Sequence, residues 1–295
     1  SSDKTQRLMA RFQRKGDGFS CVVVANNPKR TLPCGCNVAV SHATGDIIIR
    51  VDAHAGIPED FITKNVQVIQ SGESICGGIV KSLIQKDTGI HHVLNLVENS
   101  PFGGGTASFR HATENKYVDT LAFAAYRQEV FEKVGRYNEW LTRTEDNEMH
   151  YRIRQAGYRF FFSSDITSAR YTRNSFTALM KQKYLNGYWI GLTMGVCPQC
   201  FSKYHFVPFV FVLGVLITTS LCFFGLWQPA VLLWIAYAAA AILATVLASR
   251  ESKKTPAFLL MPLLFLCMHI SYGVGTLAGL IKMPFSLLKM RGMSA

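Results

Sequence analysis

Short apolar runs separated by polar turns fill the first two thirds of the chain, and long uncharged runs fill the rest. Four short runs predict β-strands, at residues 19–25, 46–51, 74–82 and 118–126. The run 46–51 contains three consecutive isoleucines and a valine. Branched residues of this kind suit a strand that is buried on both faces of a parallel sheet.

Helices are predicted between these strands from apolar spacing and from boundary residues. They span residues 4–13, 34–43, 58–70, 128–134 and 144–156. Thr144 is expected to cap the last of these helices, whose first turn is acidic. The alternation of strands and helices predicts an α/β fold in which helices cover a parallel sheet.

Residues 86–116 show no regular period. They contain a glycine-rich stretch, residues 101–106, that lacks the Gly-Lys-Ser/Thr ending of a phosphate loop. We interpret this stretch either as a flexible connection or as a loop that covers a substrate.

Three apolar stretches long enough to cross a membrane span residues 206–227, 229–249 and 256–281. The basic loop at 250–254 is predicted to be cytoplasmic by the positive-inside rule, and this places the N-terminal part of the chain in the cytoplasm as well. The third stretch either crosses the bilayer or re-enters it, and the sequence leaves both open.

Aromatic and basic residues recur at helical spacing in residues 175–194, just before the apolar stretches. This pattern is typical of an amphipathic helix in the membrane interface, and an ordinary packed helix is the alternative. The predicted organisation is a cytoplasmic domain at 1–174, an amphipathic interface segment at 175–204 and a transmembrane region at 205–295.

Composition narrows the class of protein. Apolar residues make up 49% of the chain, which excludes a disordered protein. The net charge of +12 fits either nucleic acid or an anionic membrane surface and phosphate groups. Because the apolar content is concentrated after residue 206, we assign the basic excess to membrane and phosphate chemistry and expect no nucleic-acid partner.

The eight cysteines are spread along the chain, which favours a reduced compartment over a disulfide framework. Cys34 with Cys36 and Cys197 with Cys200 could together bind zinc, a less favoured alternative. The chain opens on a polar segment without an initiator methionine, so we expect a fragment or a processed form.

Two places carry candidate chemistry. Asp52 and His54 follow the strand 46–51, where a carboxylate and an imidazole can reach one divalent ion, although a polar turn is an equal alternative. Glu145 and Asp146 begin a helix, where acidic residues serve either as a plain cap or in chemistry.

Several short motifs together resemble a known family. They are Ser1 to Thr5, like the tail of an Asp-Gly-Ser-x-Asp-x-Thr motif; Asn37 with Ala39; Gly45 to Ala55, like an Asp-x-His metal motif; Val118 to Thr120 with Phe131 to Gly135; Thr144 to Asp146, like a Glu-Asp motif; and Gln182 to Trp189, a loose form of Gln-x-x-Arg-Trp. In order and spacing the chain resembles membrane-associated family 2 glycosyltransferases, most closely the succinoglycan-type exopolysaccharide glucosyltransferases.

The resemblance implies a GT-A-like domain that binds a nucleotide sugar, most simply a UDP-sugar, followed by transmembrane helices. The family's first strand has no counterpart here, so the N-terminal strand is expected to be missing. The implied activity is inverting transfer of a single sugar, a hexose such as glucose, to a polyprenyl-diphosphate-linked acceptor in exopolysaccharide or capsule synthesis. A non-catalytic membrane scaffold of polysaccharide assembly is the alternative.

The resemblance also implies residue roles. Asp52 and His54 would hold Mn²⁺ or Mg²⁺, Asp146 would be the general base, and Glu145 would orient the acceptor. The implied donor-binding residues are Asp3, Asn37, Asp52, Arg173, Lys181, Gln182 and Lys183, and the implied acceptor-binding residues are Asp119, Thr120, Glu145 and Trp189. The implied location is the inner (plasma) membrane, multi-pass, in contact with membrane lipid and with the catalytic domain in the cytoplasm.

Overall fold

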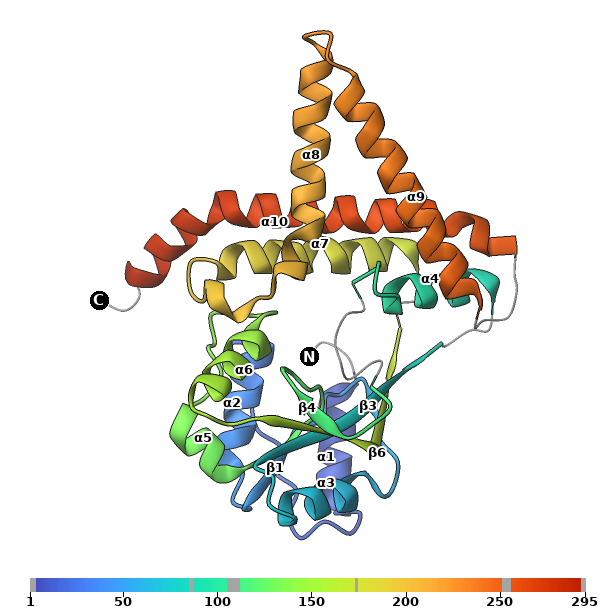
Figure 1. Ribbon diagram of the computed structural model, residues 1–295. Helices are drawn as coiled ribbons and strands as arrows, with labels where there is room; N and C mark the ends of the chain where they lie inside the picture. The colour runs from blue at the N-terminus through green and yellow to red at the C-terminus, as the bar shows by residue number, and fades with distance from the viewer. Residues whose placement is uncertain (1–3, 85–87, 105–111, 173–174, 251–255, 293–295) are drawn as a thin grey trace.

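A mixed sheet forms the centre of the N-terminal part of the protein (Figure 1). The computed structural model describes residues 4–84, 88–104, 112–172, 175–250 and 256–292. The strands are β1 (Ile47–Ile49), β2 (Ala55–Gly56), β3 (Ile75–Leu83), β4 (Lys116–Val118), β5 (Ala125–Arg127) and β6 (Phe160–Tyr171). Their order is β1-β5-β3-β6-β2, with β4 paired to β6.

The expectation of a parallel sheet is wrong. Within the described residues only β3 and β6 pair in parallel, and the other ladders are antiparallel. A hydrophobic pattern predicts where a strand lies, but not whether it runs parallel or antiparallel to its neighbours. Antiparallel neighbours need no crossover helix, so short strands can pair in this way. The strand predicted at 46–51 is also shorter than expected, since β1 has only three residues. It is half-buried rather than fully buried, because within the described part it pairs only with β5.

Two further strand expectations fail, and one strand was not predicted. Residues 19–25 form no strand and remain extended, with Phe19 and Val23 exposed, because no described strand lies beside them. The predicted strand 118–126 is two separate strands, β4 and β5. The twelve-residue strand β6 was not predicted at all, although its three phenylalanines begin it.

The helices agree better with the sequence. They are α1 (Thr5–Lys15), α2 (Leu32–His42), α3 (Phe61–Gln70), α4 (Gly89–Asn99), α5 (Gln128–Val134), α6 (Glu145–Gln155) and α7 (Phe176–Thr193). Only α4, inside the segment judged irregular, was not predicted. Gly135 and Gly157, which follow α5 and α6, have φ of 84° and 89°, left-handed values that glycine adopts at little cost.

Apolar side chains pack on both faces of the sheet. On one face Tyr126, Met149 and Phe160 join the sheet to α5 and α6. On the other, Phe61 and Ile69 of α3 pack against Ile166 of β6. The two cores fix α2, α5 and α6 around the end of β1, where the candidate residues lie.

Three helices in the described chain are long and apolar enough to cross a membrane. They are α8 (Val207–Cys222), extended backwards by a 3-10 turn at Lys203–Phe206, α9 (Gln228–Arg250), and α10 (Met261–Gly292), preceded by a 3-10 turn at Pro256–Leu260. The first turn between them falls earlier than predicted, at 223–227, so Gln228 and Pro229 already belong to α9.

Figure 1 shows α8 and α9 as a hairpin that projects away from the sheet, whereas α10 lies beside α7 and roughly across the hairpin. Glycines face each other along the α7–α10 contact. A Cβ on Gly187 would lie 2.0 Å from the carbonyl oxygen of Tyr272, and one on Gly279 would lie 2.1 Å from that of Tyr188. Small residues spaced four apart allow such close approach of helix backbones in membranes.

The predicted amphipathic character of 175–194 is not found. One face of α7 is buried by α10, yet the apolar side chains Phe176 and Tyr184 remain exposed elsewhere on the helix. The segment is therefore a packed helix with apolar side chains around its circumference.

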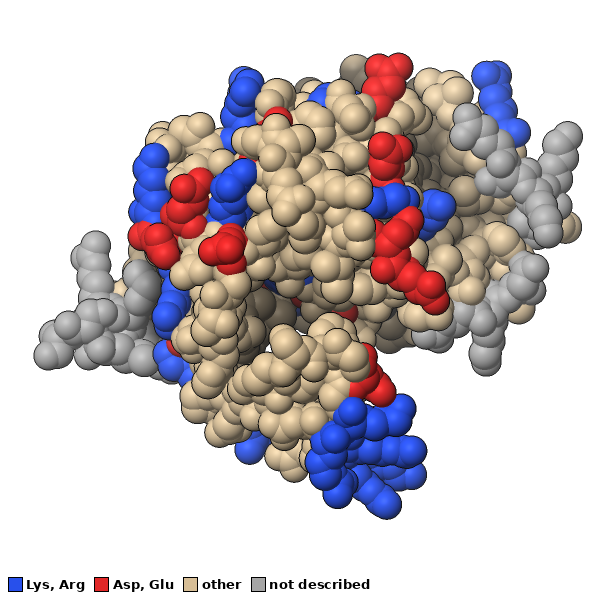
Figure 2. Space-filling model, turned by 90° about the horizontal axis from the view of Figure 1, so that it is seen from below, with Lys and Arg blue, Asp and Glu red and all other residues tan. Residues whose placement is uncertain are grey.

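Basic residues are not confined to the part of the molecule that carries the apolar helices. Viewed from the end opposite the hairpin, Figure 2 shows one dense group of Lys and Arg side chains on a projecting lobe. Helix α1 is exposed along its whole length and carries Arg7, Arg11, Arg14 and Lys15. Part of the basic excess therefore lies away from the apolar helices.

Candidate active site

Arg50, at the end of β1, lies among the acidic candidates. Its Nε donates to Oδ1 of Asp52 at 3.1 Å, and its Nη2 lies 3.7 Å from Oε1 of Glu145. Its guanidinium also stacks over the ring of Tyr137, 5.4 Å from the centroid. Burial alone disfavours the charged guanidinium, but Tyr137, Cys36 and Asp52 raise the pKa of Arg50.

Glu145 and Asp146 are adjacent carboxylates at the start of α6, in this environment. Glu145 is 3% exposed, and its Oε2 atom is buried without a hydrogen-bond partner. Burial, reinforced by the charge of Asp146, raises the pKa of Glu145 to about 7. Burial also raises the pKa of Asp146, against the opposing effect of Arg50. The pair therefore takes up a proton near neutral pH.

The N-terminus of α6 acts on this pair through its backbone amides. Oδ1 of Asp146 accepts a hydrogen bond from the Asn147 amide at 3.0 Å. The dipole and free amides of a helix N-terminus favour an ionised carboxylate. The amides do lower the pKa of Asp146, but burial outweighs them.

Thr144 does not cap α6 with its side chain, contrary to the sequence prediction. Its hydroxyl instead lies 2.6 Å from the hydroxyl of Thr193 in α7, and both residues are buried. A hydroxyl engaged with a neighbouring helix is no longer directed at the amides of its own first turn.

Asp52 and His54 are the candidate metal ligands, and they follow β1 as predicted. Asp52 gives one oxygen to Arg50, while His54 is exposed, with its ring 6.4 Å from that of Phe123. No group of three or more His, Cys, Asp or Glu side chains able to hold a metal forms within the described ranges. One carboxylate and one imidazole fit a site in which a bound ligand supplies the remaining positions.

The zinc alternative fails. Cys34, Cys36, Cys197 and Cys200 all lie in the described part of the chain, and no metal-binding group is formed there. Burial raises the pKa of the Cys36 and Cys200 thiols, which disfavours the thiolates that zinc requires.

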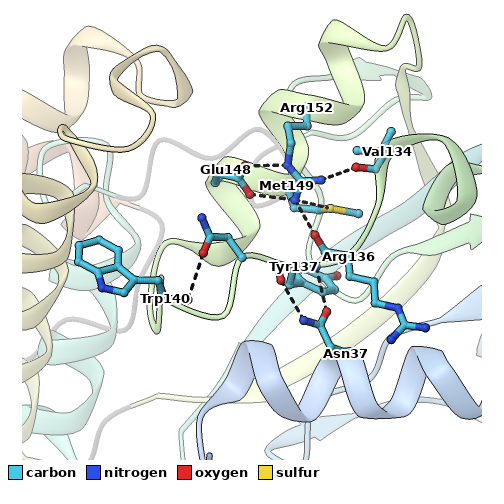
Figure 3. Close-up of polar contacts among 9 residues, drawn as sticks. Asn37, Val134, Arg136, Tyr137, Trp140, Glu148, Met149 and Arg152 are labelled. Atoms are coloured by element: carbon cyan, nitrogen blue, oxygen red, sulfur yellow. Dashed lines mark hydrogen bonds and ion pairs between the residues drawn. The ribbon is translucent and has the colours of Figure 1, made fainter. Parts of the chain in front are cut away.

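Asn37 has a structural role in α2. Its amide nitrogen donates to the Tyr137 carbonyl oxygen and to Oε1 of Glu139, and its oxygen accepts from the Tyr137 amide at 2.9 Å. Figure 3 shows the two bonds between Asn37 and Tyr137 holding Tyr137 over α2, with Trp140 pointing away from the network. They fix the ring of Tyr137 beside Arg50.

Arg152 secures the other end of the same loop. It forms an ion pair with Glu148 at 2.6 Å and donates to the carbonyl oxygens of Val134 and Arg136 (Figure 3). The loop between α5 and α6 is thus bonded to α2 through Asn37 and to α6 through Arg152.

Asp119 and Thr120, the expected acceptor residues, precede β5. The side chain of Asp119 is exposed, whereas Oγ1 of Thr120 lies 2.8 Å from Nδ1 of His150. Burial lowers the pKa of His150 to about 3, so this imidazole is neutral.

Comparison with known proteins gives a consistent picture. Residues 1–135 match the sequence model of the family described as glycosyl transferase family 2. The chain is 24% identical to a Methanococcus voltae protein, and the match covers 96% of this chain and 85% of that protein. The Methanococcus protein is dolichyl N-acetyl-alpha-D-glucosaminyl phosphate 3-beta-D-2,3-diacetamido-2,3-dideoxy-beta-D-glucuronosyltransferase. Residues 1–135 therefore form a family 2 glycosyltransferase segment.

Two further relatives extend this assignment. The glycosyltransferase is 28% identical to the succinoglycan biosynthesis protein ExoA of Rhizobium meliloti, over 62% of this chain and 55% of ExoA. Its fold is similar to that of the mannosyltransferase PcManGT from Pyrobaculum calidifontis, solved with GDP-Man and Mn²⁺. The TM-score is 0.53 at 17% identity, covering 94% of this chain and 75% of PcManGT. The GT-A-like fold followed by long apolar helices is thereby confirmed.

The remaining candidates of the glycosyltransferase lie on or near α7. Nζ of Lys183 is buried and donates to the Gly103 carbonyl oxygen at 3.2 Å, while Lys181 is exposed and Gln182 half-buried. Trp189 packs edge-to-face on Trp140, with centroids 6.2 Å apart. Asp3 and Arg173 lie outside the described residues.

The start of the glycine-rich stretch is held by contacts with the apolar helices α9 and α10. Phe102 packs on Phe265 and Tyr237, and its carbonyl oxygen lies 2.8 Å from Nε2 of His269. Lys183 binds the next carbonyl. Residues 101–104 are therefore a fixed contact between the two parts of the glycosyltransferase, and the rest of the stretch, from residue 105, lies outside the described residues.

Sequence reasoning gave no role to Arg50, Tyr137 or Thr193. A signal existed only for Arg50, a charged residue between Ile49 and Val51 in an apolar run. Such a residue in a strand needs a partner, and acidic groups near the same strand end are the natural ones. Tyr137 and Thr193 come into the site from loops and helices that only the fold brings together.

Proposed function

We propose that this glycosyltransferase transfers a single hexose, with inversion, from a UDP-sugar to a lipid-linked acceptor at the membrane surface. The observation that carries the proposal is the pair formed by buried Glu145 and half-buried Asp146, beside Arg50 and Asp52. A carboxylate of raised pKa close to a cation can accept a proton at neutral pH.

In the proposed reaction the acceptor hydroxyl oxygen attacks the anomeric carbon of the donor. The bond from that carbon to the diphosphate breaks, the hydroxyl proton passes to Asp146, and the nucleoside diphosphate leaves. One direct displacement inverts the anomeric centre. Glu145, buried against Arg50, orients the acceptor, while Arg50 stabilises the ionised form of the pair.

Asp52 and His54 would hold a divalent ion, Mn²⁺ or Mg²⁺, whose chemistry is to offset the negative charge that develops on the departing diphosphate. The imidazole favours Mn²⁺. Support comes from the position of both side chains after β1 and from the Mn²⁺ in the solved mannosyltransferase of similar fold.

A lipid-linked acceptor is supported by two observations. The Methanococcus relative is named for an acceptor carried on dolichyl phosphate. In this chain residues 140–144, which precede the proposed base Asp146, contact α7, and α7 packs along the apolar helix α10. We propose a polyprenyl-diphosphate carrier, a place in exopolysaccharide or capsule synthesis, and a multi-pass protein of the inner (plasma) membrane with its catalytic domain in the cytoplasm.

The test uses membranes carrying the full chain, supplied with Mn²⁺ and, one at a time, radiolabelled UDP-glucose, UDP-galactose, UDP-N-acetylglucosamine and GDP-mannose. We expect transfer of label from one UDP-hexose to the lipid fraction. Asp146→Asn should lower turnover by about 10²–10⁴-fold while UDP binding persists, because the amide keeps the shape but takes no proton. Glu145→Gln should be milder.

The result that overturns the proposal is full turnover of both variants, or UDP binding by the parent with no transfer from any donor. The second outcome would establish the alternative of a non-catalytic scaffold of polysaccharide assembly. A dead Glu145→Gln beside an active Asp146→Asn would move the base to Glu145.

A further inference from the structure

Three contacts join the segment that leads into the carboxylate pair to α7. The ring of Trp140 packs on that of Trp189, Nη1 of Arg143 donates to Oδ1 of Asn186 at 2.8 Å, and the hydroxyls of Thr144 and Thr193 lie 2.6 Å apart. On α7 the three partners are spaced three and four residues apart, at positions 186, 189 and 193. They therefore lie on one face of the helix.

A different stripe of α7 is packed against α10. It contains Leu179, Lys183, Gly187 and Gly191, each four residues from the next and all buried. A Cβ on Gly191 would lie 2.5 Å from the carbonyl oxygen of Thr276. Helix α7 is thus clamped on one side by α10, and its other face offers a rigid surface to residues 140–144.

Hydrogen-bond geometry gives a direction to the threonine contact. Oγ1 of Thr193 lies 2.6 Å from the Trp189 carbonyl oxygen of its own helix, which can only accept. The single hydroxyl proton of Thr193 is therefore used there, and Thr144 donates to Oγ1 of Thr193. The two residues are 4% and 0% exposed, so water cannot replace either partner.

Thr144 also begins α6 through its backbone, since its carbonyl oxygen accepts from the Glu148 amide at 3.1 Å. The next residue, Glu145, points its carboxylate at Arg50. Fixing the Thr144 side chain therefore fixes the turn from which both carboxylates extend. A helix on the membrane side of the molecule sets the position of the proton-accepting group.

We propose that Thr193 is a positioning residue for sugar transfer: through the hydroxyl of Thr144 it holds the Glu145–Asp146 pair in register with Arg50. This inference rests on the proposed function, because it takes Asp146 as the proton acceptor. Misplacing a catalytic group by about 1 Å can cost about 10²-fold in rate. The loss should fall on kcat, since the donor site after β1 is untouched.

The experiment compares Thr193→Val, Thr193→Ser and Thr245→Val in the full chain in nanodiscs, with Mn²⁺, the UDP-sugar that the parent uses and its lipid acceptor. Thr245 is the matched control: its hydroxyl also donates to a carbonyl four residues earlier, that of Ala241 at 2.8 Å, but it lies on α9, outside the α7–α10 contact. We expect Thr193→Val to lower kcat by about 10- to 100-fold with unchanged donor KM and unchanged Mn²⁺–UDP binding. Thr193→Ser, which keeps the hydroxyl, should restore most of kcat, and Thr245→Val should match the parent.

A double-mutant cycle identifies the contact. If the two hydroxyls act through one hydrogen bond, Thr144→Val with Thr193→Val loses no more activity than Thr193→Val alone. The inference is overturned if the two losses multiply, if Thr193→Val turns over like the parent, or if Thr193→Ser is as impaired as the valine variant.

Asp146→Asn separates the two levels of the proposal. With Asp146→Asn inactive and Thr193→Val at parental rate, only the positioning role fails and the proposed function stands. With Asp146→Asn at parental rate, the assignment of the base fails, and the positioning role fails with it.

Discussion

At the scale of single residues, one arginine organises the acidic groups of the site. Arg50 is bonded to Asp52, reaches Glu145 and counteracts the burial that raises the pKa of Asp146. Three carboxylates thus depend on one guanidinium. Their protonation is therefore sensitive to any change of charge within the group, and pH is the variable that reports on it.

The rate of sugar transfer should rise with pH through about 7, as the Glu145–Asp146 pair loses its proton. In Glu145→Gln the limb should move to lower pH, because removing one carboxylate removes the repulsion that resists ionisation of the other. A pH series of kcat for both proteins is the measurement. A limb that stays near pH 7 in Glu145→Gln would contradict the pairing.

The same pKa has a consequence for stability. A glutamate whose folded pKa lies above its unfolded value destabilises the fold as pH rises from about 4.3 to about 7. At pH 8 Glu145→Gln should therefore have a free energy of unfolding higher than that of the parent by on the order of 3 kcal/mol, and should unfold at a higher temperature. At pH 4 the two proteins should be equally stable. Thermal unfolding at both pH values checks the sign.

Replacement of the proposed metal ligands should separate binding from folding. Asp52→Ala is expected to abolish transfer and Mn²⁺-dependent UDP binding, while His54→Ala should raise the Mn²⁺ concentration needed for half-maximal binding. Asp60→Ala is the matched control, because that carboxylate pairs with Lys64 on the surface of α3. Full transfer by Asp52→Ala in the presence of a chelator would refute the site.

At the scale of elements, helices were predicted from sequence more accurately than strands. Caps, glycines and apolar periods are local, so α5, α6 and α7 begin and end within two residues of the prediction. Strands depend on partners: 19–25 has the composition of a strand but pairs with no strand in the described part of the chain, whereas β6 was overlooked and pairs with three strands. Similarly, Asp52, Glu145 and Asp146 were found from motifs, but the Thr144–Thr193 contact joins residues 49 apart and leaves no local pattern.

The close contact between α7 and α10 makes a prediction at this scale. Gly191→Leu and Gly279→Leu should each lower the free energy of unfolding by at least about 1–3 kcal/mol, because the leucine side chains would meet backbone atoms of the facing helix. Gly214→Ala in α8 is the control, because its Cβ would meet only the side chain of Leu233, at 3.8 Å. Yield and thermal stability in detergent are the readouts. Parent-like stability of both leucine variants would show that the helices do not pack in this way.

At the scale of the whole molecule, the direction of α10 bears on the question that hydropathy left open. Because α10 runs along α7 and across the hairpin, we infer that only α8 and α9 cross the bilayer, so both ends of α10 stay on the same side as the sheet (Figure 1). The close packing of α10 on α7 gives the physical reason, since a crossing α10 would have to leave this contact.

Single cysteines in a cysteine-free background test this arrangement. Ser41→Cys in α2 and Lys282→Cys in α10 should react with a membrane-impermeant thiol reagent from the same side, and Phe224→Cys in the hairpin turn should react from the other. Labelling of Lys282→Cys together with Phe224→Cys would mean that α10 crosses as well.

The pairing of α7 with α10 also has a consequence for biosynthesis. The two helices are separated in sequence by the whole hairpin, so α7 leaves the ribosome well before the helix that clamps it. Until α10 follows, the surface that holds residues 140–144 has no support from behind. We expect a chain truncated after Arg250 to bind nucleotide yet remain inactive, so that incomplete polypeptides in the membrane do not consume sugar donor.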